Sequence, residues 1–241
     1  MRLIQRNVTF SSGGYLLKGV LHMPDILRPS VVIGSHGLLS SGDSPKQIAL
    51  ALQCNKAGLA FFRFDHRGAG QSEGDFYEVT TLQSRCEDLS SAVRLMQERD
   101  DTGDRLGLFG SSMGGAVCLC TALEFDIEAL VVFAAPVRSG PIVDAAASSN
   151  EISPKDLLFY KKNLSFDLSG GLQKLRNILI FHGDEDEIVP LSDAEEIFSK
   201  ASKPKKLIIQ KGGDHPMNDS AHQKEFIKES AAWYKGTGIF S

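Results

Sequence analysis

The clearest chemistry in the sequence lies at residues 110–114, which read GSSMG and fit the pattern G-x-S-x-G. An apolar run precedes this motif and a segment of helical character follows it, so the motif occupies a strand-to-helix turn. Such a turn holds its serine in a strained conformation, and the flanking glycines remove side chains that would clash. In this register Ser112 is the candidate nucleophile and Ser111 is not. The helix N-terminus beside Ser112 favours developing negative charge.

A serine is a weak nucleophile at neutral pH, so it needs a base, and the base needs an acid that orients it. Two segments downstream supply both. HGDEDEIVP at 182–190 follows the apolar run ILIF, and GDHP at 213–216 follows LIIQ. Both lie at the carboxyl ends of expected strands, where open α/β sheets place their sites. His215 is the candidate base, and Asp184 and Asp186 both remain candidates for the acid.

The elements that must position these residues alternate between short apolar strands and amphipathic helices. This pattern predicts a mostly parallel sheet with helices on both faces. Residues 3–10 and 16–23 flank Ser-Ser-Gly-Gly and predict an N-terminal antiparallel hairpin. Further strands are expected at Val31–Ser35, Ala60–Phe64, Leu106–Phe109, Ala129–Ala134, Ile178–Phe181 and Leu207–Gln210. Helices are expected at Pro45–Lys56 (capped by Asp43 or Ser44), Thr80–Arg99, Met113–Glu124, Asp193–Ser199 and Ala221–Tyr234.

Residues 136–175 break this rhythm, because they contain several prolines and glycines and no clear strand. Short helices such as Pro154–Lys162 are expected there. Long excursions from α/β folds often carry function, so we expect a small lid over the site. A surface-packing insertion is the alternative. Residues 1–241 are therefore expected to form a single domain with a lid at about 136–175.

From about Leu16 to Tyr234 the chain resembles the serine α/β-hydrolase superfamily, whose nucleophile, acid and base follow in this chain order. HGxxDxxVP at 182–190 resembles the acid-bearing loop of its esterases, thioesterases and peptidases. DHRGAGQSEG at 65–74 resembles a loop that is mainly architectural in that superfamily. With the HGL turn at 36–38 and the short insertion, the chain is most similar to cinnamoyl and feruloyl esterase-like and serine aminopeptidase-like (S33-type) hydrolases. The resemblance implies an α/β-hydrolase fold with a mostly parallel eight-stranded sheet.

The resemblance also implies a role for each candidate residue. Ser112 would be the nucleophile, His215 the base and Asp186 the acid that orients it. The backbone N–H groups of Met113, which follows the nucleophile, and of Leu38, in the HGL turn, would form the oxyanion hole. The chain lacks an HGGG stretch and departs there from the lipase-like branch. This route to acyl transfer needs no metal and no cofactor.

Composition argues against several other classes of protein. The chain has 241 residues, with 26 Lys plus Arg and 30 Asp plus Glu, a net charge of −4. This balance gives no electrostatic case for nucleic acid or an anionic membrane as a partner. No apolar run approaches the ~20 residues of a membrane span, and the first ten residues do not read as a signal peptide. Four cysteines without a CxxC pair predict reduced core residues of a cytoplasmic protein and no metal site.

The predicted function is hydrolysis of small-molecule carboxylic esters with short-to-medium or aromatic acyl groups, hydroxycinnamoyl esters among them, through an acyl-enzyme. Apolar lid residues either line an acyl pocket or pack the lid onto the core; they are Leu157, Leu158, Phe159, Tyr160, Leu164 and Phe166. Hydrolysis of thioesters or of small amides and peptides stays open as an alternative. A non-catalytic, ligand-binding member of the fold also stays open, as does a homodimer through the edge strand or the last helix.

Overall fold

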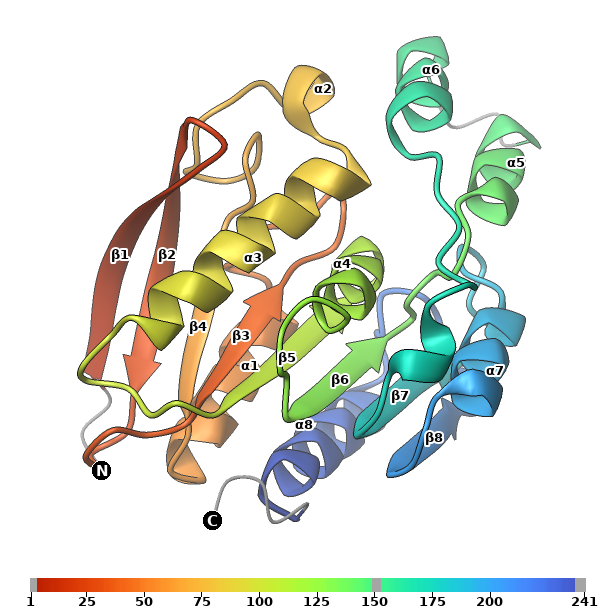
Figure 1. The fold of residues 1–241 in the computed structure, drawn as a ribbon. Coiled ribbons are helices and arrows are strands. Elements are labelled where there is room, and N and C mark those ends of the chain that lie inside the picture. The colour runs from red at the N-terminus through yellow and green to blue at the C-terminus, as the bar shows by residue number, and fades with distance from the viewer. Residues whose placement is uncertain (1–3, 149–152, 237–241) are drawn as a thin grey trace.

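The core of the computed structural model, which describes residues 4–148 and 153–236, is one eight-stranded sheet (Figure 1). The strands are β1 Ile4–Ser12, β2 Tyr15–Met23, β3 Val31–Ser35, β4 Ala60–Phe64, β5 Leu106–Ser111, β6 Ala129–Phe133, β7 Ile178–Gly183 and β8 Lys205–Gln210. Their order in the sheet is β1-β2-β4-β3-β5-β6-β7-β8. β1 and β2 form the expected antiparallel hairpin and β2 is antiparallel to β4, whereas every later pair is parallel. The predicted fold class is confirmed; Leu3 lies outside the described residues.

Helices cover both faces of the sheet (Figure 1). They are α1 Pro45–Lys56, α2 Phe76–Val79, α3 Leu82–Gln97, α4 Met113–Thr121, α5 Gly140–Ser148, α6 Pro154–Asn163, α7 Leu191–Lys200 and α8 Ser220–Gly236, with a 3₁₀ turn η1 at Leu172–Lys174. α1 and α8 pack with each other on one face, and α3, α4 and α7 cover the other. The parallel strands are thus buried on both sides, which explains why they read as continuous apolar runs.

The alternation of side chains in β3 shows how the two faces are filled. Val31 and Ile33 enter the apolar cluster beneath α3 and α4, and Val32 enters the cluster beneath α1 and α8. Successive residues of a strand point to opposite faces, so a single five-residue strand supplies both cores. The predicted bounds of this strand match those in the structure.

Most elements begin or end within one to three residues of the sequence-based expectation, and two of the differences have a clear physical cause. β5 continues to Ser111, because its ladder with β6 extends to the pair Ser111 and Phe133. The long helix α3 begins at Leu82 rather than Thr80, because Thr81 caps it through a reciprocal capping box with Ser84. The preceding short helix α2 was not predicted, since four residues are too few to show a helical period.

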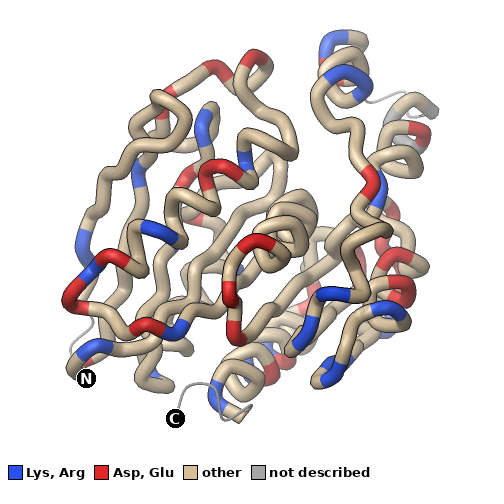
Figure 2. The backbone as a smooth tube through the Cα atoms, viewed as in Figure 1, with Lys and Arg blue, Asp and Glu red and all other residues tan. Residues whose placement is uncertain are grey.

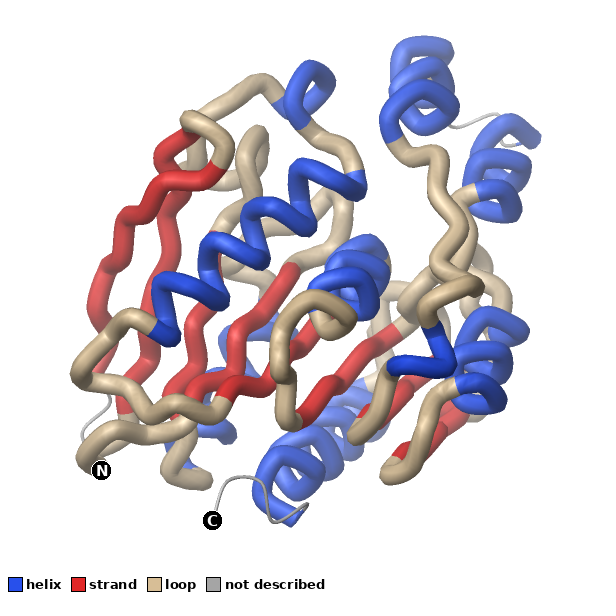
Figure 3. The backbone as a smooth tube through the Cα atoms, viewed as in Figure 1, coloured by secondary structure: helices blue, strands red, loops and turns tan. Residues whose placement is uncertain are grey.

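The segment 136–175 rises from the carboxyl edge of the sheet and carries α5 and α6 (Figure 1). Irregular segments join these helices to the sheet layer (Figure 3). Ser139 and Phe166 pair across these two segments: the Ser139 N–H donates to the Phe166 carbonyl at 3.2 Å, and the Phe166 N–H donates to Ser139 Oγ at 3.0 Å. The base of the segment is therefore a paired stem. Residues 149–152 lie outside the described residues.

Acidic and basic residues are mixed along the whole backbone, without a long stretch of one sign (Figure 2). Over the described residues, the structure contains no helix with the length and apolar character of a membrane span. No group of three or more His, Cys, Asp or Glu side chains gathers to hold a metal ion in residues 4–148 and 153–236.

Candidate active site

Ser112 lies at the turn between β5 and α4, with a positive φ of 55° and ψ of −124°. A non-glycine residue in this conformation is strained by about 1–3 kcal/mol. The flanking glycines make the turn possible. A Cβ added to Gly110 would lie 2.6 Å from the carbonyl carbon of Gly114, and one added to Gly114 would lie 2.7 Å from the His36 carbonyl oxygen. The Ser112 N–H donates to the Phe133 carbonyl at 2.8 Å, which ties the turn to β6.

The structure brings Ser112, His215 and Asp186 into one hydrogen-bonded series. Nε2 of His215 is 3.0 Å from Ser112 Oγ. Nδ1 of His215 is 2.8 Å from Oδ2 and 3.0 Å from Oδ1 of Asp186. A carboxylate accepts the Nδ1–H, so Nε2 is left to accept the serine proton. The arrangement therefore has the geometry that activates a serine hydroxyl.

Asp186 occupies a built carboxylate site at the end of β7. Its side chain is fully buried, and Oδ1 accepts the N–H groups of Ile188 at 2.9 Å and Val189 at 2.8 Å. Burial alone would raise the pKa of this carboxyl. The hydrogen bond and charge of His215 and the two N–H groups outweigh burial, and they lower the pKa below its usual value. Asp186 is therefore held as the anion that an imidazolium needs.

Asp184, the other acid candidate, points elsewhere. It is exposed, and its Oδ1 accepts the N–H of Gly212 at 2.6 Å, which supports the neighbouring turn. Of the two aspartates, Asp186 is the one that contacts His215. Although the two aspartates are only two residues apart, Asp186 is a buried partner of the imidazole and Asp184 is a residue of a surface turn.

The HGL turn after β3 lies beside the serine. A Cβ added to Gly37 would be 3.6 Å from the Cβ of Ser112 and 3.5 Å from the Ser111 carbonyl. Leu38 follows this glycine, and Met113 begins α4. Among the hydrogen bonds of the described residues, neither the Leu38 N–H nor the Met113 N–H donates to a protein acceptor. Both residues lie next to Ser112, Met113 along the chain and Leu38 in the turn that contacts it.

A lysine that the sequence did not mark supports the loop of His215. Lys46, in the first turn of α1, donates to the Pro216 carbonyl at 2.8 Å, and its Nζ lies 4.7 Å from the centroid of the Phe133 ring. Burial lowers the pKa of Lys46 to about 8, although the carboxylates of Asp214 and Asp186 oppose this shift. No local pattern distinguishes this lysine, because its partner lies 170 residues away in the sequence.

A second Ser–His–Asp group lies inside the molecule and serves as an internal contrast. Ser35 Oγ is 2.8 Å from Nε2 of His66, and Nδ1 of His66 is 3.3 Å from Asp88 Oδ2. All three residues are fully buried. They join β3, the loop after β4 and α3, and no substrate can reach the serine. His215, by contrast, keeps 14% of its side chain exposed. Access, and not only hydrogen bonding, separates the two groups.

Leu38 and Met113, the two residues next to Ser112, belong to one apolar cluster. The other members of this cluster come from α2 and the 136–175 segment and are mostly aromatic; they include Phe76, Tyr77, Phe159, Tyr160, Leu164 and Phe166. Four of the six apolar lid residues singled out in the sequence are therefore in this cluster, and Leu158 is 66% exposed. The aromatic rings stand directly beside the candidate nucleophile's turn.

Hydrogen bonds connect α6 to α2. The Tyr77 hydroxyl donates to Asp156 at 2.8 Å, and Nδ2 of Asn163 donates to the Tyr77 carbonyl at 3.1 Å and the Thr80 carbonyl at 3.2 Å. Lys155 Nζ lies 3.6 Å from the centroid of the Tyr77 ring. The short helix α2, which sequence patterns did not reveal, is therefore the part of the main layer that holds α6.

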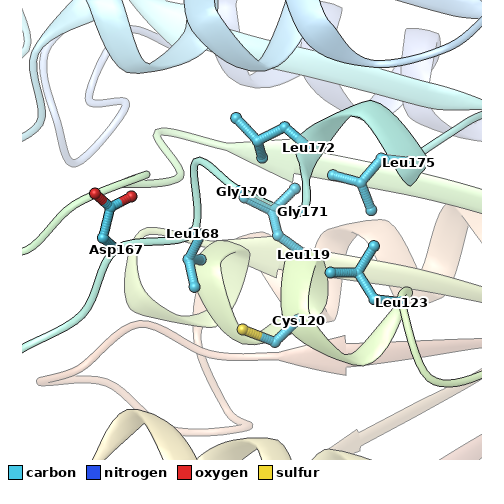
Figure 4. Close-up of a pocket in the computed structure, with 9 residues that line it drawn as sticks. All are labelled: Leu119, Cys120, Leu123, Asp167, Leu168, Gly170, Gly171, Leu172 and Leu175. Carbon is cyan, nitrogen blue, oxygen red and sulfur yellow. The ribbon is translucent and has the colours of Figure 1, made fainter.

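A separate pocket of about 300 Å³ lies against the C-terminal half of α4 (Figure 4). Its walls are mainly leucines from α4, from the turn after it and from the 167–175 segment: Leu119, Leu123, Leu168, Leu172 and Leu175. None of Ser112, Asp186 and His215 lines it.

The four cysteines are reduced; Cys54 and Cys118 are buried, and Cys86 and Cys120 are partly exposed. Cys120 lines the pocket.

Comparison of the sequence with protein families gives one match. Residues 28–159, more than half of the 241, match the family described as serine aminopeptidase, S33. The matched range includes the turn at 36–38 and the motif at 110–114. The segments that carry Asp186 and His215 lie beyond it.

Curated proteins similar to this chain include the uncharacterized protein YfhR of Escherichia coli (strain K12). It is 27% identical over 187 residues, which cover 77% of this chain and 63% of YfhR. The chain thus spans less than two thirds of the length of this relative. The mitochondrial palmitoyl-protein thioesterase ABHD10 of Mus musculus is 25% identical over 209 residues, which cover 77% of this chain and 68% of that protein.

Solved structures with the same fold include Est1E from Butyrivibrio proteoclasticus, described with bound ferulic acid. It has a TM-score of 0.81 at 20% identity, and the match covers 95% of this chain and 98% of Est1E. The Pyrococcus furiosus esterase Pf2001 has a TM-score of 0.83 at 18% identity, and the match covers 99% of this chain and 94% of that chain. At these identities the likeness establishes the α/β-hydrolase fold.

Proposed function

Because this chain belongs to the S33 serine aminopeptidase family of α/β-hydrolases, we propose that it is a serine hydrolase that cleaves carboxylic esters. The observation that carries the proposal is the series Ser112–His215–Asp186, with 3.0 Å and 2.8 Å between its polar atoms. The series stands at a strained turn beside two unused N–H donors. A serine with a purely structural role does not require this combination of features.

The proposed mechanism has two halves. Ser112 Oγ attacks the ester carbonyl while Nε2 of His215 takes its proton, and Asp186 stabilises the imidazolium. The N–H groups of Leu38 and Met113 donate to the oxyanion of the tetrahedral intermediate. His215 then gives the proton to the departing alcohol, which leaves an acyl-enzyme. Water then attacks the acyl carbonyl as His215 takes its proton, and His215 passes that proton to Ser112 Oγ as the acid leaves, which restores the free hydroxyl.

The proposed substrates have short-to-medium or aromatic acyl groups. The aromatic cluster of α2 and α6 beside Leu38 and Met113 supports this class, because the acyl group of an ester held in the oxyanion hole starts next to these side chains. The likeness to Est1E, described with ferulic acid, supports hydroxycinnamoyl esters as members of the class. In the same proposal, residues 136–175 act as a lid that covers the acyl group.

Hydrolysis of acyl thioesters is a second candidate. It is favoured by the similarity to the mouse palmitoyl-protein thioesterase ABHD10, which covers 77% of this chain. The same serine, base and oxyanion donors serve either leaving group, so the triad does not discriminate between an alcohol and a thiol. Because the matched family is described as serine aminopeptidase, peptide amides are also included among the substrates to be compared.

The test is a substrate panel measured with matched variants. It contains nitrophenyl esters of increasing chain length, methyl ferulate, acyl-coenzyme A thioesters and amino-acid nitroanilides. Ser112→Ala is compared with Ser111→Ala, which changes the adjacent serine only. We expect ester turnover and fluorophosphonate labelling in the native chain and Ser111→Ala, and neither in Ser112→Ala.

Three results would contradict the ester proposal. If Ser112→Ala turned over esters at the native rate, Ser112 would not be the nucleophile. A higher kcat/KM for thioesters or nitroanilides than for every ester would make thioesters or amides the substrate class in place of carboxylic esters. Absence of turnover and of labelling over the whole panel would instead favour a ligand-binding member of the fold.

A further inference from the structure

Three consecutive carbonyl groups of the HGL turn converge on one buried guanidinium. Arg85, on α3, donates from Nη1 to the carbonyls of His36 at 3.1 Å and Gly37 at 3.3 Å, and from Nη2 to the Leu38 carbonyl at 3.0 Å. The side chain of Arg85 is fully buried. Its targets are backbone oxygens rather than a carboxylate, so its contacts define the path of this turn.

Two further donors contact the carbonyl of the peptide between Gly37 and Leu38, the Ser40 N–H at 3.3 Å and the ring of His36. Nδ1 of His36 lies 2.8 Å from the Gly37 carbonyl oxygen, and Nε2 of His36 accepts the His66 N–H at 3.1 Å. The His66 bond leaves the ring proton on Nδ1, where it donates to Gly37. Burial, with the nearby charge of Arg85, lowers the pKa of His36 well below its usual value, so the ring stays neutral.

These contacts determine where the Leu38 N–H points. In a trans peptide the C=O and N–H bonds of one unit point in opposite directions. The Gly37 carbonyl faces Arg85 and the His36 ring, so the N–H of Leu38 faces away from them. The same turn lies against Ser112, since a Cβ on Gly37 would be 3.6 Å from that residue's Cβ.

We propose that Arg85 is a positioning residue of the oxyanion hole, which holds the Leu38 N–H toward the reacting carbonyl through the backbone oxygens of residues 36–38. The inference rests on the proposed function, because an oxyanion hole has meaning only for acyl transfer. Arg85 touches no reacting atom itself. A charged donor on a peptide oxygen also polarises that peptide, which strengthens its N–H as a donor.

The charge needed for this role is retained in the fold. Burial lowers the pKa of Arg85 to about 10, and Asp88, one turn further along α3, opposes that shift. The guanidinium therefore remains protonated at neutral pH. Asp88 also accepts the Arg67 N–H at 3.0 Å, so one buried face of α3 supports both the turn after β3 and the loop after β4.

The experiment compares Arg85→Met and Arg85→Lys with Arg94→Met, an exposed arginine on the same helix, as the control. For each variant, kcat and KM are measured on the best nitrophenyl ester, together with the inhibition constant of phenylboronic acid. This acid forms a tetrahedral anion on an active serine, whereas KM reports mainly ground-state binding. Circular dichroism and thermal melting check the fold.

Loss of one oxyanion donor costs about 10²–10³-fold in kcat. We expect that loss in Arg85→Met, with KM within about threefold of the native value and phenylboronic acid weakened by a similar factor. Arg85→Lys, which keeps a charged donor in the same space, should fold and be intermediate. Arg94→Met should match the native chain. A folded Arg85 variant with native kcat and native boronate affinity would overturn the proposal, as would a change confined to KM.

A separate readout distinguishes failure of this inference from failure of the proposed function. If the native chain turns over no substrate and binds no boronate, the hydrolase proposal has failed. The amide resonance of Leu38 in ¹⁵N-labelled protein then still tests the placement of its N–H. We expect its chemical shift and exchange rate to change in Arg85→Lys and not in Arg94→Met. An unchanged Leu38 resonance in Arg85→Lys would overturn the role of Arg85.

Discussion

Gly110 and Gly114 lie back to back across the turn that carries Ser112. A Cβ on Gly110 would stand 2.6 Å from the carbonyl carbon of Gly114. Gly114 in turn lies against the end of β3, where its added Cβ would stand 2.6 Å from the Ser35 carbonyl carbon. The obstacles are backbone atoms, which cannot move aside as the end of a flexible side chain can. The two glycines of the motif are therefore required by backbone packing, apart from any role of Ser112 in chemistry.

Gly114→Ala should lower both stability and ester turnover. Overpacking of this kind costs about 1–3 kcal/mol, and the strain displaces Ser112 relative to His215. The free energy of unfolding from urea titration and kcat on the best ester measure the two effects. Gly170→Ala is the matched control, because nothing lies within 4 Å of its added Cβ. Equal stability of the two variants would mean that the turn can relax.

Asp186→Asn should lower kcat by about 10³–10⁴-fold, because a neutral amide neither fixes the required tautomer of His215 nor stabilises its charged form. Asp184→Asn is the control, since that side chain contacts Gly212 and not the imidazole. Its kcat should stay within about twofold of the native value, as expected for a surface substitution away from the site. A larger loss in Asp184→Asn than in Asp186→Asn would reverse the assignment of the acid.

Asn163→Ala should loosen the lid from α2. The side chain donates to the Tyr77 and Thr80 carbonyls, and each such bond contributes about 1 kcal/mol. Loss of both bonds should therefore quicken hydrogen exchange of the amides in α6 about thirtyfold, and KM should rise most for the bulkiest acyl groups. Lys162→Ala, on the exposed side of the same helix, should leave exchange unchanged. Equal exchange in both variants would show that the apolar cluster alone holds the lid.

Acid should destabilise the fold in part through His66. Burial is the main cause that lowers the pKa of this imidazole from 6.5 to about 4, although Asp88 opposes the shift. Between these pH values His66 is protonated in the unfolded chain and remains neutral in the folded chain. Stability is therefore full above pH 6.5 and falls as the pH drops toward 4, by about 1.4 kcal/mol per pH unit for this proton.

The matched variants for this effect are His66→Gln and Ser35→Ala. Unfolding free energies between pH 6.5 and 4 should fall less steeply in His66→Gln, because the titrating group is gone. Ser35→Ala removes only the hydrogen bond to the ring at 2.8 Å, so it should lower stability and keep the native slope. The interpretation would be wrong if His66→Gln kept the native pH dependence.

Local signals in the sequence were sufficient for the elements with buried apolar runs. The bounds of β3, α1 and β4 agree with those expected, because both faces of these strands are buried and Ser44 caps a helix with proline in its first turn. α2 escaped prediction because its four residues are too few to show a helical period, and its contacts with α6 are long-range. Arg85 carried a weak signal, since it lies on the apolar stripe of α3 between Leu82 and Leu89.

The sequence by itself determined the residue types, their order along the chain and the tight turn at Ser112, because apolar runs and glycine spacing act over a few neighbouring residues. The resemblance of the 182–190 segment implied Asp186 as the acid, but the residues alone left Asp184 open, and the tertiary structure shows that Asp186 contacts His215. Only the tertiary structure revealed that Arg85 contacts the turn at 36–38. Both contacts depend on the packing of segments far apart in the chain. The loop after β7 contacts the loop after β8, and α3 packs near β3, so the partner of each polar group is set by the register of the sheet.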